Sequence, residues 1–223
     1  MFSKVSSVSS LGRKLTNFSP RICQQARNEA TLVGEVSKEE PRLTQYKKSK
    51  FVRARHPDPY QIEVNMTAEA KERSKRTAVV EVNLPGFSSW TLYCDENKPV
   101  GDDTAPPPLA YLSAGVGLCL MTHLSDILNA RKIDVKSLKL EQRILFSTNL
   151  GHMRDHGCET KGKCDVVESH VIVESPESES RIRGLLEEAE GACMAHWAFR
   201  NPVPWSTRLV HNGKETANRS SSE

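Results

Sequence analysis

Two cysteines in this sequence occupy positions where a thiol is expected to face the packed side of a helix. Cys119 lies in a mostly apolar series with spacings of three or four residues: Leu109, Leu112, Val116, Cys119, His123 and Ile127. A second such series consists of Ile182, Leu186, Ala189 and Cys193. This spacing is the period of one face of an α-helix. Two neighbouring thiols have a redox chemistry available, because a sulfenic acid formed on one condenses with the other to a disulfide.

Each cysteine taken alone also has a structural interpretation, because a free cysteine often acts as a small buried hydrophobic residue. A disulfide requires in addition that the two stripes face each other, since the Cα atoms must lie about 4.4–6.8 Å apart. His123 lies one turn beyond Cys119, where side chains on a helix are neighbours. An imidazolium there would favour the thiolate of Cys119. The sequence favours the other interpretation, a hydrogen-bonded core histidine.

Apolar periodicity predicts the helices that would position these thiols. The first is expected over residues 108–128, buried on nearly all sides, with three prolines at its entrance. A stripe of small residues on it would let another backbone approach closely: Ala110, Ser113 or Ala114, and Gly117. The second helix is expected to begin with Ser175 as N-cap and Pro176 in the first helical position, and to end near Cys193.

Alternating apolar residues predict strands around these helices. They are expected at residues 62–66, 77–84, 90–94, 136–148, 164–174 and 206–210. The fourth and fifth are expected to form an antiparallel pair with an extended loop. The resulting order of strands and helices indicates an α+β domain with helices packed on antiparallel sheet.

Composition narrows the class of protein. Of the 223 residues, 37% are hydrophobic and 26% are charged, which is typical of a soluble globular protein. The net charge is only +3, and no basic patch interleaved with aromatics indicates nucleic-acid binding. The apolar segment at 108–128 contains serines, glycines and His123, which favour a core helix over a membrane span. Six irregularly spaced cysteines indicate a reducing compartment rather than a disulfide scaffold.

Residues 1–35 have the character of a mitochondrial presequence. The segment is basic and rich in serine, and it has no acidic residue before Glu29. Its apolar residues would lie along one face of a helix. We therefore expect import into the mitochondrial matrix, with a disordered basic tail as the alternative. Residues 36–59 are expected to be a polar linker or arm, 60–212 the folded domain and 213–223 a disordered tail.

A loop between two of the predicted strands carries side chains that zinc prefers. They are His152, His156, Cys158 and Cys164, spaced as H-x3-H-x-C-x5-C. This spacing matches no standard zinc motif. We therefore expect a polar, solvent-exposed loop and no metal site.

Two blocks of the sequence resemble the cysteine motifs of the OsmC/Ohr superfamily, which comprises osmotically inducible protein C and the organic hydroperoxide resistance proteins. The blocks are PPPLAYLSAGVGLCLMTHL, with Cys119, and LLEEAEGACMAH, with Cys193. The resemblance covers about residues 60–212. It implies an OsmC-like α+β fold, in which antiparallel sheets wrap around a long buried central helix with a second helix. It also implies an intertwined homodimer with the active site at the subunit interface.

The activity that this resemblance implies is a thiol-dependent peroxidase acting on organic hydroperoxides, including lipid hydroperoxides. Cys119 would be the peroxidatic thiol and Cys193 the resolving thiol. No bound cofactor is implied; the reductant would be an external dithiol such as dihydrolipoamide. In a mitochondrion, lipoylated proteins would supply that dithiol.

The sequence departs from the family's pattern in three places. Leu109 stands where peroxidases of the family carry an acidic residue beside a proline, and Met194-Ala195-His196 replaces a proline-containing sequence. Arg73 and Arg76 lie in the region that supplies the family's thiolate-binding arginine, but no motif selects either. A catalytically inactive OsmC-like protein that binds a hydrophobic ligand or a protein partner is therefore the alternative function. A third is an assembly factor that uses the basic arm at 47–55.

Overall fold

The computed structural model describes residues 35–37, 45–47, 50, 61–150 and 159–220. Contacts between residues divide the chain into two compact units, 1–107 and 108–223, each described here by itself. The boundary falls immediately before the long helix, inside the stretch 60–212 that the sequence indicates as one domain. The elements are antiparallel strands and helices, which confirms the predicted α+β class.

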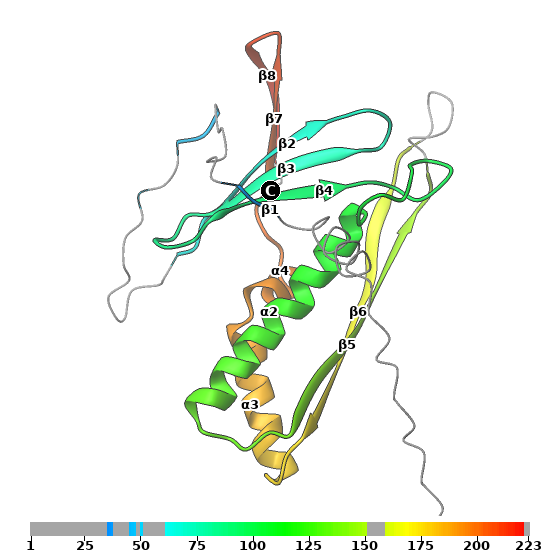
Figure 1. Cartoon of the computed structure of the whole chain (residues 1–223). Coiled ribbons are helices and arrows are strands. Elements are labelled where there is room, and N and C mark those ends of the chain that lie inside the picture. Colours follow the sequence, from blue (N-terminus) through cyan, green and yellow to red (C-terminus); the bar gives the residue numbers. More distant parts are fainter. Residues whose placement is uncertain (1–34, 38–44, 48–49, 51–60, 151–158, 221–223) are drawn as a thin grey trace, which may run out of the picture. The chain divides into compact units, whose positions relative to one another are not determined.

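The first unit contains a four-stranded antiparallel sheet in the order β1-β4-β3-β2 (Figure 1). Its strands are β1 (Glu35–Ser37), β2 (Val64–Ala70), β3 (Arg76–Val82) and β4 (Ser89–Cys94). The three longer strands confirm the predicted ones, although β2 continues to Ala70, beyond the predicted end at residue 66. Gly86, with a φ of 87°, lies in the turn between β3 and β4, where its lack of a Cβ permits this backbone conformation.

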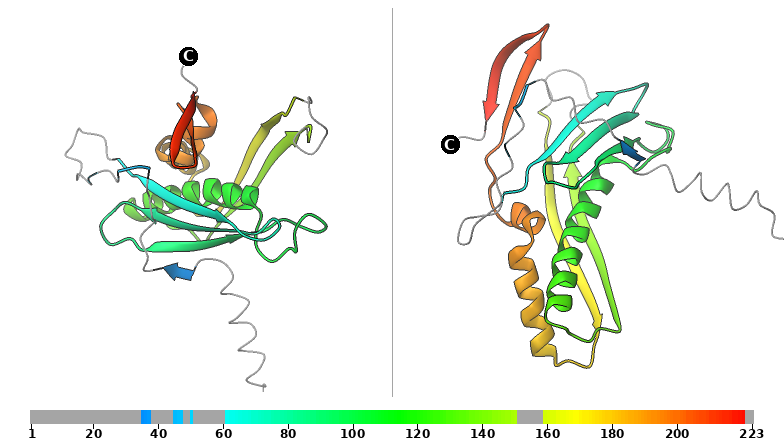
Figure 2. Two further views of the ribbon diagram at one scale, coloured as in Figure 1. Left: turned by 90° about the horizontal axis from the view of Figure 1, so that it is seen from above. Right: turned by 60° about the vertical axis from the view of Figure 1, so that its left-hand side comes forward.

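The second unit begins with α2 (Pro108–Ala130), followed by the long hairpin of β5 (Ser137–Thr148) and β6 (Gly162–Glu174). Then come α3 (Glu179–Ala192), the short α4 (Met194–Arg200), and a hairpin of β7 (Ser206–His211) and β8 (Lys214–Ser220). Helix α2 packs against α3, α4 and β5. The right-hand view of Figure 2 shows the β5–β6 hairpin running along α2. The antiparallel pairing of β5 with β6 was predicted and is confirmed.

The core of the second unit is an apolar cluster between α2 and α3. Its buried members are Leu120, Leu124 and Leu128 from α2, Leu185 and Ala189 from α3, and Cys193. Side chains from β5 and β6, including Leu138, Leu140 and Val171, pack against it. Burial of this surface provides the main free energy that holds the two helices together.

Helix α2 is buried on one face in the single chain, which corrects the prediction that it is buried on nearly all sides. Its buried leucines follow one another at intervals of four residues. Of the predicted stripe, Val116 is fully buried, and Cys119 and Ile127 pack against the core. Leu109 and Leu112 of that stripe are 49% and 43% exposed, and Cys119 and His123 are half-buried. Among the described helices α2 alone has the length and apolarity of a membrane span, a criterion that core helices also meet.

The small-residue stripe of α2 was predicted to let another backbone approach, whereas the atoms that approach Gly117 belong to side chains of β5. A Cβ at Gly117 would lie only 2.9 Å from Cδ2 of Leu140 on β5. One turn earlier, Nε2 of Gln142 donates a hydrogen bond to the carbonyl oxygen of Ser113 at 2.8 Å. Close approach and the hydrogen bond together fix β5 against α2.

Two predictions about where helices and strands begin or end are wrong. Helix α3 is capped by Ser178, whose Oγ accepts from the backbone N–H of Arg181, and not by Ser175. The hydroxyl of Ser175 instead donates to the carbonyl oxygen of Asp134. Residues 214–220, expected to lie in a disordered tail, form β8, which pairs with β7.

The leucine cluster yields a first prediction. Leu124→Ala is expected to lower the free energy of unfolding by about 2–5 kcal/mol, because it leaves a cavity between α2 and α3. The matched control is Leu118→Ala on the same helix, where the side chain is 67% exposed and the expected change is about 0.5 kcal/mol or less. Urea denaturation followed by circular dichroism measures both, and equal losses would contradict this assignment of the buried face.

Candidate functional site

Cys193 lies at the junction of α3 and α4 and is fully buried. Its backbone N–H donates to the carbonyl oxygen of Glu190 at 3.3 Å, which closes α3, and its carbonyl oxygen accepts from the N–H of Trp197 at 2.9 Å, which opens α4. The cysteine is therefore held from both sides by helical hydrogen bonds. The prediction that it lies on the apolar face near the end of a helix is confirmed.

Cys119 of α2 packs against the buried cluster that contains Cys193. A side-chain hydrogen bond and the charge of Cys119 both raise the pKa of Cys193, so the two thiol groups are neighbours. Both are free thiols. The structure thus brings together the two cysteines that the helical spacing singled out.

The environment of Cys193 keeps its thiol protonated. Burial is the largest cause that raises its pKa above the ordinary value, because a thiolate loses its hydration there. The backbone amides of His196 and Ala195, at the start of α4, act in the opposite direction, and the neighbouring Cys119 adds to the rise. Nucleophilic attack by this sulfur therefore requires that a nearby group take its proton.

His196 is the functional residue that the sequence analysis missed. Its Nδ1 lies 3.2 Å from Sγ of Cys193. The Cys-x-x-His spacing across the start of a helix was the available signal, because residues three apart on a helix are neighbours. Of the described histidines it is His196, and not His123, whose ring lies within hydrogen-bond distance of a thiol.

A groove of about 400 Å³ opens beside His196. It is lined from β6 by Cys164, Asp165, Val166, Val167 and Ser169, and from the helices by Glu190, His196, Phe199 and Arg200. The guanidinium of Arg200 donates to the carbonyl oxygen of Glu190 at 2.8 Å. Burial, followed by the charge of Arg200, lowers the pKa of His196, so its imidazole is neutral at physiological pH.

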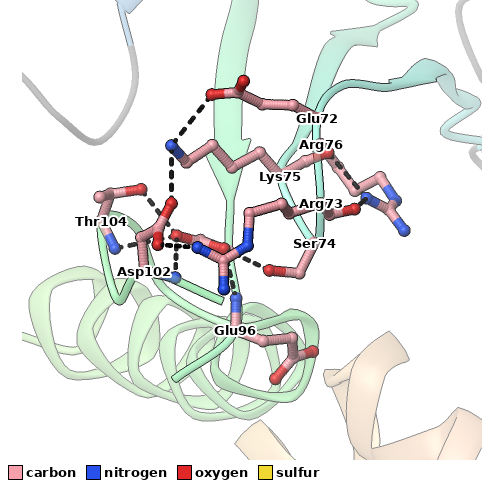
Figure 3. A network of polar contacts seen from close by, with 9 residues as sticks. Glu72, Arg73, Ser74, Lys75, Arg76, Glu96, Asp102 and Thr104 are labelled. Carbon is pink, nitrogen blue, oxygen red and sulfur yellow. Dashed lines mark hydrogen bonds and ion pairs between the residues drawn. The ribbon is translucent and has the colours of Figure 1, made fainter. Parts of the chain in front are cut away.

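The first unit contains a separate polar centre at Asp95, which is fully buried. Figure 3 shows Ser74, Glu96, Asp102 and Thr104 around this centre. Its Oδ1 accepts from the hydroxyl of Ser74 at 2.6 Å and from the N–H of Glu96 at 2.8 Å. Its Oδ2 accepts from the N–H of Asp102 at 3.2 Å and from the N–H and hydroxyl of Thr104 at 3.1 and 2.8 Å. These hydrogen bonds, that of Ser74 above all, hold the pKa of Asp95 far below its usual range.

This network ties the segment 95–104 to the turn between β2 and β3. A Cβ at Gly101 would lie 2.1 Å from the carbonyl oxygen of Glu96 and 2.5 Å from Oδ1 of Asp95, so no side chain fits there. Both oxygens of the Asp95 carboxylate accept hydrogen bonds from donors within the unit. We therefore assign Asp95 a structural role.

Arg73 and Arg76, the two candidates for a thiolate-binding arginine, make contacts within the first unit (Figure 3). Arg73 donates to Oδ1 of Asp102 at 2.6 Å and to the carbonyl oxygen of Pro99 at 3.3 Å. Arg76 donates to the carbonyl oxygens of Arg73 and Lys75. Lys75 completes the cluster with an ion pair to Oδ2 of Asp102 at 3.0 Å.

The loop expected to be polar and solvent-exposed carries four side chains of the types that zinc prefers. Three of them, His152, His156 and Cys158, lie outside the described residues. The fourth, Cys164, is exposed on β6. Within the described ranges no group of three or more His, Cys, Asp or Glu side chains is placed to hold a metal ion.

The Asp95 network yields a second prediction. Asp95→Asn is expected to lower the thermal midpoint at pH 7, because the amide NH₂ replaces an oxygen that accepts from two or three donors. Since the pKa of Asp95 is depressed in the folded state, its stabilisation is complete above the ordinary carboxyl pKa of about 4 and declines as the pH falls below that value. The gap between wild type and variant should shrink there.

Circular dichroism melts at pH 7 and about pH 3 measure this difference. The control is Asp103→Asn, because Asp103 is exposed and its φ of 60° is one that asparagine also tolerates. A pH-independent gap between wild type and Asp95→Asn would contradict the role of the carboxylate charge.

Several solved structures resemble this chain at low identity. An OsmC-like hydroperoxide resistance protein from a Jannaschia species is 21% identical, with a TM-score of 0.45, and the match covers 69% of this chain and 97% of that one. An OsmC-like protein from Mycoplasma pneumoniae is 22% identical, with a TM-score of 0.48 and coverages of 62% and 87%. An organic hydroperoxide resistance protein from Legionella pneumophila is 15% identical, with a TM-score of 0.39 and coverages of 62% and 89%.

No curated protein matches the chain. A family model described as OsmC-like protein matches residues 101–208, just under half of the chain. The matched segment runs from the loop before α2 to β7 and contains both thiols, His196 and the cluster between α2 and α3. Residues 101–208 are therefore similar to OsmC-like proteins.

Proposed function

We propose that this protein is a thiol-dependent peroxidase that reduces organic hydroperoxides through Cys119 and Cys193. The observation that carries the proposal is the neighbourhood of these two thiols, one from α2 and one from the end of α3, at a single apolar cluster. The Jannaschia and Legionella proteins, named as hydroperoxide resistance proteins, lend it support.

The two thiols take different roles because their exposure differs. Cys119 is half-buried and reachable by a substrate, whereas Cys193 is fully buried. The thiolate of Cys119 attacks the peroxide oxygen, which yields an alcohol and the sulfenic acid of Cys119. The thiol of Cys193 then displaces water from that sulfenic acid and forms a disulfide. An external dithiol reduces the disulfide by two successive exchanges and is itself oxidised to a disulfide.

The surroundings of the thiols favour an alkyl or lipid hydroperoxide over hydrogen peroxide. The cluster on which both cysteines lie consists of leucine, alanine and other apolar side chains. An alkyl chain gains free energy by leaving water for such a surface, and hydrogen peroxide has no group that does so.

Activity is tested with cumene hydroperoxide and dihydrolipoamide in steady state. The wild type is expected to turn over, and Cys119→Ser is expected to fall to the uncatalysed rate because the attacking sulfur is gone. Cys94→Ser is the matched control, since Cys94 is a free thiol at the end of β4 in the first unit. Equal inactivity of wild type and Cys119→Ser would refute the catalytic proposal.

A disulfide between the two cysteines is the second expected outcome. One equivalent of cumene hydroperoxide should convert the reduced protein to a form two mass units lighter, with a peptide linking Cys119 to Cys193. In Cys193→Ser the sulfenic acid should persist and be trapped by dimedone. A dimedone adduct of the same intensity in wild type and Cys193→Ser would contradict the resolving role.

A catalytically inactive protein that binds a hydrophobic ligand is the second candidate function. It is favoured by the first turn of α2, which contains no acidic residue and begins with Pro108 and the exposed Leu109. Fatty-acid binding to the Cys119→Ser variant, combined with an inert wild type in the peroxidase assay, would select this function.

We propose three further properties together with the peroxidase activity. The family resemblance implies a homodimer, and the basic N-terminal segment indicates the mitochondrial matrix. Lipoylated proteins of that compartment would supply the dithiol reductant. The predicted presequence lies in residues 1–35, almost all of them outside the described ones. Fusion of residues 1–40 to a fluorescent reporter tests the location, and a diffuse cytosolic signal would exclude it. Sedimentation of the purified chain tests the dimer.

A further inference from the structure

We propose that His196 is the general base that takes the thiol proton of Cys193 when the disulfide with Cys119 forms. This inference rests on the proposed peroxidase function and adds a catalytic residue to its second step. The imidazole contacts a reacting atom directly, since its Nδ1 lies 3.2 Å from Sγ of Cys193.

The geometry of the pair is set by the backbone rather than by chance contact of two flexible side chains. Cys193 closes α3 and opens α4, and His196 follows in the first turn of α4. The hydrogen bond from the N–H of Trp197 to the carbonyl oxygen of Cys193 fixes this turn. Arg200, at the end of α4, is tied back to the carbonyl oxygen of Glu190 on α3. The position of the imidazole beside the sulfur is therefore built into the helix junction.

The chemistry of the step requires such a group. The sulfur of Cys193 forms a bond to the sulfur of the Cys119 sulfenic acid, whose S–O bond breaks. The thiol proton passes from Sγ of Cys193 to Nδ1 of His196, and the departing hydroxide takes up a proton to leave as water. His196 then returns to the neutral form by giving up its proton, so the step consumes no further oxidant or reductant. Burial disfavours a free thiolate at Cys193, so proton removal in concert with attack lowers the barrier.

The charges around His196 favour the neutral imidazole that this role needs. Burial is the largest cause that lowers the pKa of the ring, and the cation of Arg200 acts in the same direction. The carboxylate of Glu190 raises this pKa with a smaller effect. From β6, Asp165 and Cys164 face the same groove. Asp165 forms an ion pair with Lys163 at 2.5 Å, so its charge is partly compensated.

The groove gives the proton a path to solvent. His196 touches the buried sulfur with Nδ1 and also lines the groove of about 400 Å³ between β6 and α4. A neutral imidazole carries its own proton on the other nitrogen when Nδ1 accepts. Proton release from the ring into the water of the groove therefore needs no opening of the apolar cluster around Cys193.

Rapid-quench mass spectrometry of the reduced full-length chain tests the proposal by following each step separately. After one equivalent of cumene hydroperoxide, the loss of the Cys119 thiol reports the first step and the Cys119–Cys193 peptide reports the second. His196→Asn keeps an acceptor near the place of Nδ1 but is not a base. In this variant the rate of Cys119 oxidation should stay within about twofold of the wild type, and the rate of disulfide formation should fall about 100-fold. His170→Gln, which changes an exposed histidine on β6, is the control and should match the wild type.

The pH profile separates a base from a structural contact. In the wild type, the rate of disulfide formation should fall as the pH drops through the imidazole pKa, whose unperturbed value is about 6.5. In His196→Asn the rate should instead keep rising up to the higher pKa of the thiol. His196→Ala provides a second variant, in which added imidazole should restore the rate in proportion to its concentration, by entering through the groove.

The outcomes distinguish this proposal from the function on which it rests. A wild type whose Cys119 is never oxidised overturns both. The role of His196 alone is overturned by two results together. In His196→Asn, Cys119 is oxidised and the disulfide then forms at the wild-type rate and with the wild-type pH profile. In His196→Ala, added imidazole has no effect on the rate.

Discussion

The apolar contact between α2 and α3 is the interaction on which the proposed chemistry depends. A cysteine side chain is short, so the place of its sulfur is determined almost entirely by the backbone of its helix. Leu120, Leu124 and Leu185 hold the two backbones close enough for Cys119 and Cys193 to be neighbours. The same burial removes Cys193 from solvent, which raises its pKa and makes its reactivity depend on other residues.

The sequence predicts most of this scaffold because the determining patterns are local. Alternation identifies β2 to β6, and spacings of three and four residues identify α2 and α3 with Cys193 at the end of α3. The predicted stripe of α2 holds the buried Val116, but the buried leucines lie one residue further on, since neighbouring stripes of a mostly apolar helix have nearly equal hydrophobicity. The choice between them is made by long-range contacts, such as Leu140 over Gly117, which a single sequence does not show.

Residues whose roles depend on contacts with other side chains were not predicted. Ser175 and Ser178 both precede glutamates and suit an N-cap, and the hydrogen bond of Ser175 to distant Asp134 decides between them. Asp95 is unremarkable in sequence, because its donors come from Ser74 and from the loop up to Thr104. His196 gave a weak signal, the Cys-x-x-His spacing, whose meaning depends on the helix break at Cys193. His123, at an equally suitable spacing from Cys119, has no comparable contact among the described residues.

Asp95 and Cys193 are both buried and ionisable, but their surroundings give Asp95 a structural role and make Cys193 suitable for a reaction. Asp95 is surrounded by five hydrogen-bond donors, which stabilise its charge so strongly that the carboxylate neither gains nor shares a proton near neutral pH. Cys193 is equally buried, but it lies among apolar side chains and keeps its proton. The imidazole of His196, with Nδ1 at 3.2 Å from Sγ of Cys193, is a neutral acceptor. It stabilises the transition state of proton transfer more than it stabilises the resting thiol. The thiol of Cys193 can therefore react, because a single titratable neighbour, His196, controls whether it keeps its proton.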